Sequence, residues 1–190
     1  MANGGQQRSP LLWLGFLVEG CLAALAVLLG WLFEQPVWEN IRWHWQDALW
    51  GIVATLPMLA GFLICLRWPV GPLARIKQFS DEVIRPLFAP CTILELGAIS
   101  LLAGFGEEAL FRGVIQELLS RWLGVVAGLF LASFLFGLLH MITPTYALLA
   151  MLTGIYLGCW WLARDDLIVV IVAHAAYDWI ALIILVRRPP

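Results

Sequence analysis

Residues 167–186 read LIVVIVAHAAYDWIALIILV, and within this run only His174 and Asp178 are ionisable apart from Tyr177. A helix needs about 20 consecutive apolar residues to cross the hydrocarbon core of a bilayer, which is about 30 Å thick. The run therefore predicts a transmembrane helix that carries a histidine and an aspartate inside the membrane.

Comparable apolar runs fill most of the chain before this helix. They cover residues 11–33, 48–68, 91 to about 107, 122–140 and 146–163. An alternative for the third run is an unbroken helix from Cys91 to about Ser120, which would place Glu107 near the middle of the membrane. Hydrophobic residues make up 62% of the 190 residues and charged residues 13%, whereas soluble domains average about half and a quarter. We predict an all-α, polytopic bundle of about six transmembrane helices.

A charged stretch at residues 69–90 divides the chain into two parts. Residues 1–90 are expected to hold two membrane helices followed by this stretch, as a solvated loop or surface helix in the cytoplasm. Residues 91–190 are expected to hold the remaining helices and the polar motifs described below. The two parts are expected to form one membrane domain.

Basic residues are unequally distributed between the two sides of the predicted bundle. With the N-terminus inside, the cytoplasmic side holds Arg8, Arg67, Arg75, Lys77, Arg85, Arg187 and Arg188, and the other side holds Arg42, Arg121 and Arg164. Because cytoplasmic loops carry the excess of Lys and Arg, both termini are expected in the cytoplasm and the protein in the cell (plasma) membrane. The net charge of -2 and the lack of a basic block argue against nucleic acid as a partner.

Ionisable residues inside the predicted membrane helices require an explanation, because each costs about 2.5–3.5 kcal/mol at a helix centre. Glu107, Glu108 and Arg112 lie in the stretch GFGEEALFRG at residues 104–113. Glu108 and Arg112 are four residues apart, so they share a helix face and can pair, whereas Glu107 points about 100° away. The pair is either structural or orients Glu107, which is left as the free carboxylate.

Two more four-residue spacings follow along the chain. Phe136 and His140 share a helix face, as do His174 and Asp178. A glutamate and a histidine in a poorly hydrated site can together remove a proton from water, and a second histidine can stabilise an oxyanion. These groups suit hydrolysis of an amide bond. Glu19 and Glu95 lack a spaced partner and are expected to be packing or lipid-edge residues, and His44 an ordinary surface residue.

In these motifs the sequence resembles the CAAX-protease and bacteriocin-processing family of intramembrane proteases, which contains the Rce-type prenyl endopeptidases and many bacterial Abi proteins. The motifs are EExxxR at Glu107, Glu108 and Arg112; FxxxH at Phe136 and His140; and HxxxN or HxxxD at His174 and Asp178. They occur in the expected order within residues 95–186. The resemblance implies that residues 91–190 form the catalytic helix core of such a protease.

The resemblance also implies a role for each residue. Glu107 activates water with the help of His140, while His174 and Asp178 face the oxyanion. Rce-type enzymes have Asn at the position of Asp178, and an aspartate donates a hydrogen bond only when it is protonated. Glu108, Arg112 and Phe136 are expected to support the site.

The motifs also bear on whether the site holds a metal and on which substrate it takes. Glu107, His140, His174 and Asp178 could together hold zinc, but no HExxH motif is present and the ligands come from three segments, so a mechanism without a cofactor is favoured. The expected partners are the lipid bilayer and a membrane-embedded or lipidated peptide or protein substrate. Two other functions remain open: a proton-coupled transporter, and a non-catalytic immunity or scaffold protein.

Overall fold

Every regular element of residues 10–188, the part of the chain that the computed structural model describes, is a helix. The elements are α1 (Pro10–Leu32), η1 (Val37–Asn40), α2 (Trp45–Arg67), α3 (Pro72–Phe79), η2 (Ser80–Ile84), α4 (Arg85–Phe88), α5 (Ile93–Leu110), η3 (Phe111–Gln116), α6 (Glu117–Leu123), α7 (Val125–Leu139), α8 (Pro144–Arg164) and α9 (Leu167–Arg187). η1 is a 3-10 helix, and η2 and η3 are π-helical turns. Arg8, counted above for orientation, lies outside the described residues.

The prediction of an all-helical membrane bundle is confirmed. Within the described residues, α1, α2, α8 and α9 are long and apolar enough to cross a membrane. A fifth span results if the helices Pro72–Phe88 and Ile93–Leu123, which meet at 114°, are counted as one bent span. The expected number of about six is not confirmed, because α7, with 15 residues, is shorter than a full span.

The predicted helix boundaries differ from the structure around α5, α6 and α7. The helix that begins at Ile93 does not end near residue 107, because it continues through the π-helical turn η3 and through α6 as far as Gly124, where φ is 88°. The continuous helix therefore reaches Leu123, and α7 starts only at Val125. Glu107 consequently lies near the middle of a long helix.

Side chains at the helix N-termini fix where several helices begin. Thr92 accepts a hydrogen bond from the backbone N–H of Glu95, whose carboxylate in turn accepts one from the backbone of Thr92. This reciprocal capping gives Glu95 a structural role in place of the expected packing role. Thr143 caps α8 and Asp166 caps α9, each through a side-chain oxygen that accepts one backbone N–H of its helix, without a reciprocal bond.

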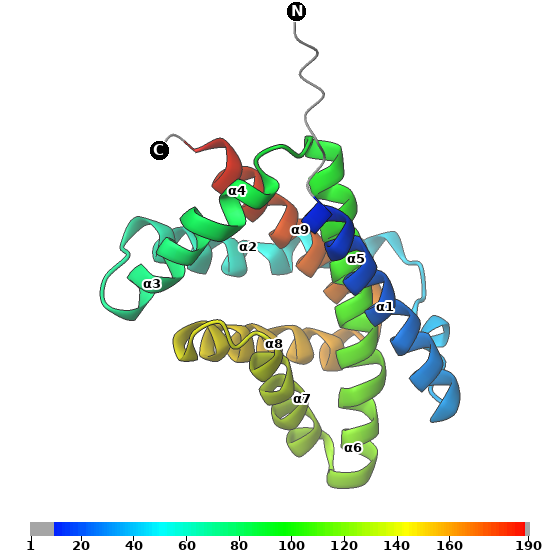
Figure 1. Ribbon diagram of the computed structural model, residues 1–190. Helices are drawn as coiled ribbons and strands as arrows, with labels where there is room; N and C mark the ends of the chain where they lie inside the picture. The colour runs from blue at the N-terminus through cyan, green and yellow to red at the C-terminus, as the bar shows by residue number, and fades with distance from the viewer. Residues whose placement is uncertain (1–9, 189–190) are drawn as a thin grey trace, which may run out of the picture.

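The continuous helix formed by α5, η3 and α6 runs through the length of the molecule (Figure 1). α9 packs against both α2 and α5, α1 packs against α5, and α7 and α8 pack against each other. The beginning of α1 and the end of α9 lie at the same end of the molecule (Figure 1). Both parts of the chain therefore contribute to one helical body.

Two glycines let α5 approach its neighbours closely. A Cβ added at Gly104 would lie 2.9 Å from the backbone nitrogen of Ala175 in α9, and one at Gly106 would lie 2.9 Å from the carbonyl oxygen of Glu19 in α1. Any larger residue would push these helices apart. The close contacts bring Glu19 of α1 and the middle of α9 next to the glutamates of α5.

The outer surface suits lipid. Large apolar side chains are exposed along the outside of α1, α2, α7 and α8, and exposed tryptophans lie near helix ends at Trp31, Trp43, Trp45, Trp68 and Trp122. Amphipathic indole rings are typical of the headgroup layer. The stretch at residues 69–90, expected as a loop or a surface helix, is helical from Pro72 to Phe88.

Candidate active site in an intramembrane cavity

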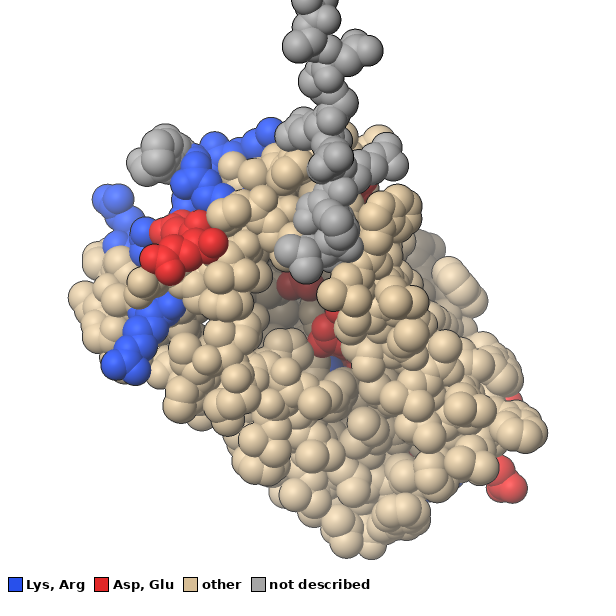
Figure 2. Space-filling view, in the orientation of Figure 1, with Lys and Arg blue, Asp and Glu red and all other residues tan. Residues whose placement is uncertain are grey.

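A cavity of about 580 Å³ lies between α1, α2, the α3–α4 segment, α5, α8 and α9. Figure 2 shows the hollow in the molecular surface, with carboxylate side chains visible inside it. Its ionisable lining consists of Glu19, Cys65, Lys77, Glu107, His140, Tyr146, Tyr156, His174, Tyr177 and Asp178, and most of the remaining lining is apolar. All four residues predicted to be catalytic therefore face one space.

Glu107 and His140 lie opposite each other in this cavity. The Oε2 atom of Glu107 is 3.7 Å from Nε2 of His140, and the same oxygen is buried without a hydrogen-bond partner. This separation is too long for a direct hydrogen bond, and a water molecule beside both atoms could bond to each of them. The spacing suits a carboxylate and an imidazole that share one water.

The tautomer of His140 follows from its second contact. The Nδ1 atom lies 2.8 Å from the backbone carbonyl oxygen of Phe136, one turn earlier in α7. A carbonyl oxygen only accepts, so Nδ1 donates its hydrogen there. In the neutral ring Nε2 then carries the free electron pair, and it is Nε2 that faces Glu107.

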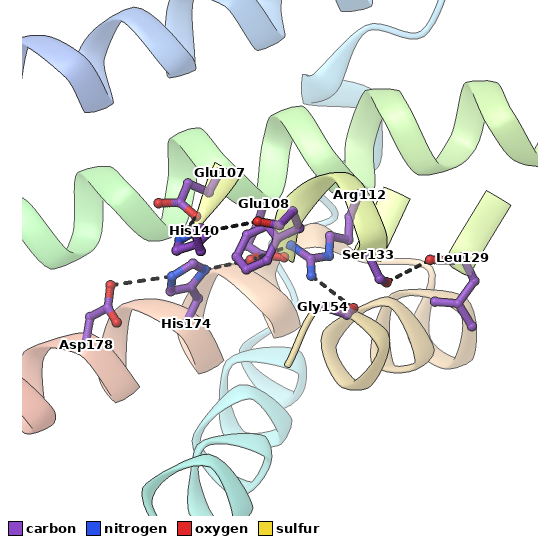
Figure 3. Close-up of polar contacts among 10 residues, drawn as sticks. Glu107, Glu108, Arg112, Leu129, Ser133, His140, Gly154, His174 and Asp178 are labelled. Carbon is purple, nitrogen blue, oxygen red and sulfur yellow. Dashed lines mark hydrogen bonds and ion pairs between the residues drawn. The ribbon is translucent and has the colours of Figure 1, made fainter. Parts of the chain in front are cut away.

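Glu108, the neighbour of Glu107 on α5, is the centre of a buried network (Figure 3). Its Oε1 atom accepts a hydrogen bond from Nη1 of Arg112 at 2.9 Å and lies 2.6 Å from Nδ1 of His174. Arg112 also donates to the carbonyl oxygen of Gly154 in α8 at 3.0 Å. The network joins three helices and holds the ring of His174 in place.

His174 lies between two carboxylates. Besides the contact of Nδ1 with Glu108, its Nε2 atom is 3.4 Å from Oδ2 of Asp178, one turn later in α9. Asp178 is partly exposed to the cavity, whereas His174 is buried. The second ring nitrogen of His174 therefore points toward the cavity beside Asp178, as Figure 3 shows.

The aromatic ring of Phe136 contacts both histidines. It stacks on His140 with ring centroids 4.4 Å apart and meets His174 edge-on at 6.2 Å. The guanidinium carbon of Arg112 lies 4.8 Å from the centre of the same ring, a distance typical of a cation–π contact. Phe136 thus sets the separation of the two imidazoles.

Sequence reasoning missed two features of this site. Glu19 lines the cavity, and its Oε2 atom is buried without a partner, so it is not a lipid-edge residue. The contact of Glu108 with His174 was also not anticipated. The cost of a carboxylate inside the membrane was the only signal for Glu19, because its neighbours come from other helices.

The same residues can be tested against a zinc centre, which usually has three or more protein ligands. Oε2 of Glu107 and Nε2 of His140 are free to ligate, and Nε2 is the nitrogen of His174 that remains for a metal, because Nδ1 contacts Glu108. In the described structure, these side chains do not bring three ligand atoms within 4.8 Å of one another. As arranged, the four residues do not fit a three-ligand zinc site.

Residues 89–180 match the family model described as type II CAAX prenyl endopeptidase Rce1-like. No curated protein and no solved structure matches the chain. The matched segment contains all three motifs and, with α5, α7, α8 and most of α9, half of the residues that line the cavity. Together with four to five helices that are long and apolar enough to cross a membrane, this indicates an integral membrane protein whose residues 89–180 match the Rce1-like family of CAAX-type intramembrane proteases.

Proposed function

We propose that this protein is an intramembrane endopeptidase in which Glu107 and His140 activate the attacking water. The observation that supports this most directly is the unpartnered Oε2 of Glu107, which lies 3.7 Å from the free Nε2 of His140 inside the cavity. An unpaired polar atom in a buried position is costly unless a ligand or water satisfies it. Here both atoms face the space that a substrate carbonyl would enter.

The proposed reaction is an ordinary amide hydrolysis. The water oxygen attacks the carbonyl carbon while Glu107 and His140 accept one proton from the water. The carbon–nitrogen bond then breaks, and the proton passes to the leaving amine. Water and one peptide bond are converted to a carboxylic acid and an amine, without any redox step.

His174 and Asp178 would act on the developing oxyanion. Since Nδ1 of His174 donates to Glu108, the ring must carry a hydrogen on each nitrogen for Nε2 to donate to the oxyanion. In the resting site Asp178 lies beside that nitrogen and orients the ring. Preorganised donors of this kind often supply the largest single contribution to the rate.

The cavity suggests the class of substrate. Apolar side chains of α2 and of the α3–α4 segment, among them Phe62, Leu73 and Ile76, form one wall. This apolar wall lines the same cavity as Glu107 and suits a lipid-attached or membrane-embedded peptide. We therefore propose that the enzyme cleaves a membrane-embedded or lipidated peptide or protein, without a metal cofactor.

Substitution of Glu107 tests the proposal. Membranes with wild-type protein, Glu107→Gln or the control Glu117→Gln are compared by mass spectrometry of the peptide termini released from membrane proteins and from added lipidated peptides. Glu107→Gln should reduce cleavage by about 100-fold or more, because general-base catalysis contributes about 10²–10⁴-fold, while Glu117→Gln should cleave normally. Equal cleavage by all three proteins would remove Glu107 from the mechanism.

The two other functions kept open by the sequence receive no specific support. A proton-coupled transporter needs a polar route to both sides of the membrane, whereas Glu107, His140, His174 and Asp178 all line one cavity. A scaffold needs no unpartnered carboxylate facing an imidazole.

A further inference from the structure

Three side chains from two distant loops converge where α8 ends and where α2 and α9 begin. His44 and Asp47 belong to the start of α2, and Asp166 caps α9. Each offers one nitrogen or carboxylate oxygen, and these atoms all lie within 4.8 Å of one another. His44 is exposed, whereas Asp47 and Asp166 are buried, so the cluster is open to solvent on one side.

Each of the two carboxylates has one oxygen held by the protein and one left over. Oδ1 of Asp47 accepts two hydrogen bonds from Arg164, and Oδ1 of Asp166 accepts from the backbone N–H groups of Arg42 and Ile168. Asp166 is 0% exposed, and its Oδ2 atom has no hydrogen-bond partner in the protein. Both carboxylates are thus fixed in orientation, and a buried oxygen is left for a ligand.

The backbone before two of these residues is unusual. Trp43, directly before His44, and Asp165, directly before Asp166, have φ of 56° and 52°, and among the described non-glycine residues only Glu34 shares a positive φ. L-residues rarely adopt this conformation. The two loops are therefore held in costly conformations at the points that aim His44 and Asp166 at each other.

We propose that His44, Asp47 and Asp166 bind one divalent transition-metal ion, of which zinc is the example tested below. An imidazole nitrogen with carboxylate oxygens is a donor set for zinc and its neighbours, whereas calcium and magnesium prefer oxygen alone. Tetrahedral ligands at about 2.0–2.2 Å lie about 3.3 Å apart. Nδ1 of His44 is already 3.7 Å from Oδ2 of Asp47, so this pair needs only a small closure, and the ligand atom of Asp166 lies within 4.8 Å of both.

The local charge also favours a cation. The three aspartates at positions 47, 165 and 166 outnumber the two arginines that pair with them, Arg42 and Arg164. Both arginines bind the outer sides of the cluster: Arg164 takes Oδ1 of Asp47, and the side chain of Arg42 takes Asp165. The fourth metal position would be filled by water on the exposed side.

The site is separate from the proposed catalytic centre. Asp166 precedes His174 by eight residues, which is about 12 Å along the helix, and no cluster residue lines the cavity. The ion would tie the loop before α2 to the loop before α9. It should stabilise the folded protein and leave peptide cleavage unchanged, so this proposal and the proposed function can fail independently.

Zinc binding to the full untagged chain in detergent tests the proposal. After removal of metals, Zn²⁺ is titrated by calorimetry into wild type, His44→Ala, Asp166→Asn and Asp165→Asn. Asp166→Asn keeps an oxygen for the helix cap but loses the second carboxylate oxygen. Asp165→Asn makes the same charge change one residue away, at an exposed position, and is the matched control.

Wild type and Asp165→Asn should bind one Zn²⁺ per chain and unfold at a higher temperature with zinc than without it. His44→Ala and Asp166→Asn should bind at least about tenfold more weakly and lose most of the shift in unfolding temperature. No zinc uptake by wild type would overturn the proposal, as would wild-type binding by His44→Ala, which removes an exposed side chain and should not disturb folding. Zinc binding that is lost in His140→Ala but kept in Asp166→Asn would also overturn the proposal, because the ion would then lie in the cavity.

Discussion

Oε1 of Glu108 lies 2.6 Å from Nδ1 of His174, although the two residues are 66 positions apart in the chain. The same oxygen accepts a hydrogen bond from Arg112. One carboxylate thereby fixes both the guanidinium that binds α8 and the imidazole that faces the cavity. The second glutamate of the EExxxR motif consequently determines how α5, α8 and α9 are placed relative to Glu107.

This network predicts a large loss of stability on removal of its cation. Arg112→Leu leaves the fully buried carboxylate of Glu108 without its arginine, with only the contact to His174 remaining, and the free energy of unfolding should fall by about 3–5 kcal/mol. Lys77→Leu is the control, because Lys77 also pairs with an acid four residues away, but Asp81 is more exposed and keeps Arg188 as a partner. The control should lose at most about 1 kcal/mol. Equal unfolding temperatures in detergent for Arg112→Leu and wild type would contradict the prediction.

The second prediction concerns Asp178. If this residue only orients His174, or acts as a protonated donor, Asp178→Asn should keep or raise the turnover number, since an amide can accept from Nε2 and also donate to an oxyanion. Asp178→Leu should lower turnover, because it can do neither. Steady-state kinetics on the same peptide substrate compares them. A severe loss in Asp178→Asn together with metal-free activity would show that the negative charge itself is required.

Removal of metal gives the third prediction. Peptide cleavage should continue after strong chelation, even when elemental analysis shows that zinc has left the protein. The reason is that Glu107 and His140 need no Lewis acid in the proposed mechanism. Activity that disappears on chelation and returns with added zinc would instead make His140, His174 and a carboxylate metal ligands. Repeating the assay with Asp166→Asn separates the two cases, since that variant lacks the site at His44 and Asp47.

The fourth prediction is the orientation in the membrane. Reporter fusions at the C-terminus and within residues 69–90 should both give a cytoplasmic signal, because the basic residues concentrate there. Figure 2 shows Lys and Arg side chains gathered at that end of the molecule. A fusion in the turn at Gly124 should report the opposite side. A periplasmic or lumenal signal at either of the first two positions would reverse the assignment.

Sequence spacing predicted contacts within one helix and failed between helices. The pair of Glu108 with Arg112 and the proximity of His174 to Asp178 follow from a four-residue separation, and both are present. The contact of Glu108 with His174 depends instead on how closely α5 and α9 approach, which the backbone contact at Gly104 determines. No local periodicity encodes that distance.

The same limit explains the other discrepancies. Glu19 and His44 appeared isolated in the sequence because the groups beside them come from distant segments. Glu19 shares the cavity with Glu107 of α5, and His44 lies near Asp166 at the start of α9. The length of α7 was overestimated because the apolar run continues across Gly124 without a change in hydrophobicity. The break at Gly124 depends on its backbone conformation, which the hydrophobic pattern does not show. Hydrophobicity thus predicted the class of fold, while boundaries depended on single backbone conformations.

The short α7 has a consequence for the bilayer itself. Its 15 residues give a helix about 22 Å long, against a hydrocarbon thickness of about 30 Å, and Leu131, Phe134, Leu135 and Leu138 are exposed along it. Lipid tails beside this helix meet a hydrophobic mismatch, and local thinning of the bilayer relieves it. Thinning carries headgroups and water toward the end of α7, where His140 lies. The membrane around the protein would then be deformed at the point where a hydrolase needs water to enter.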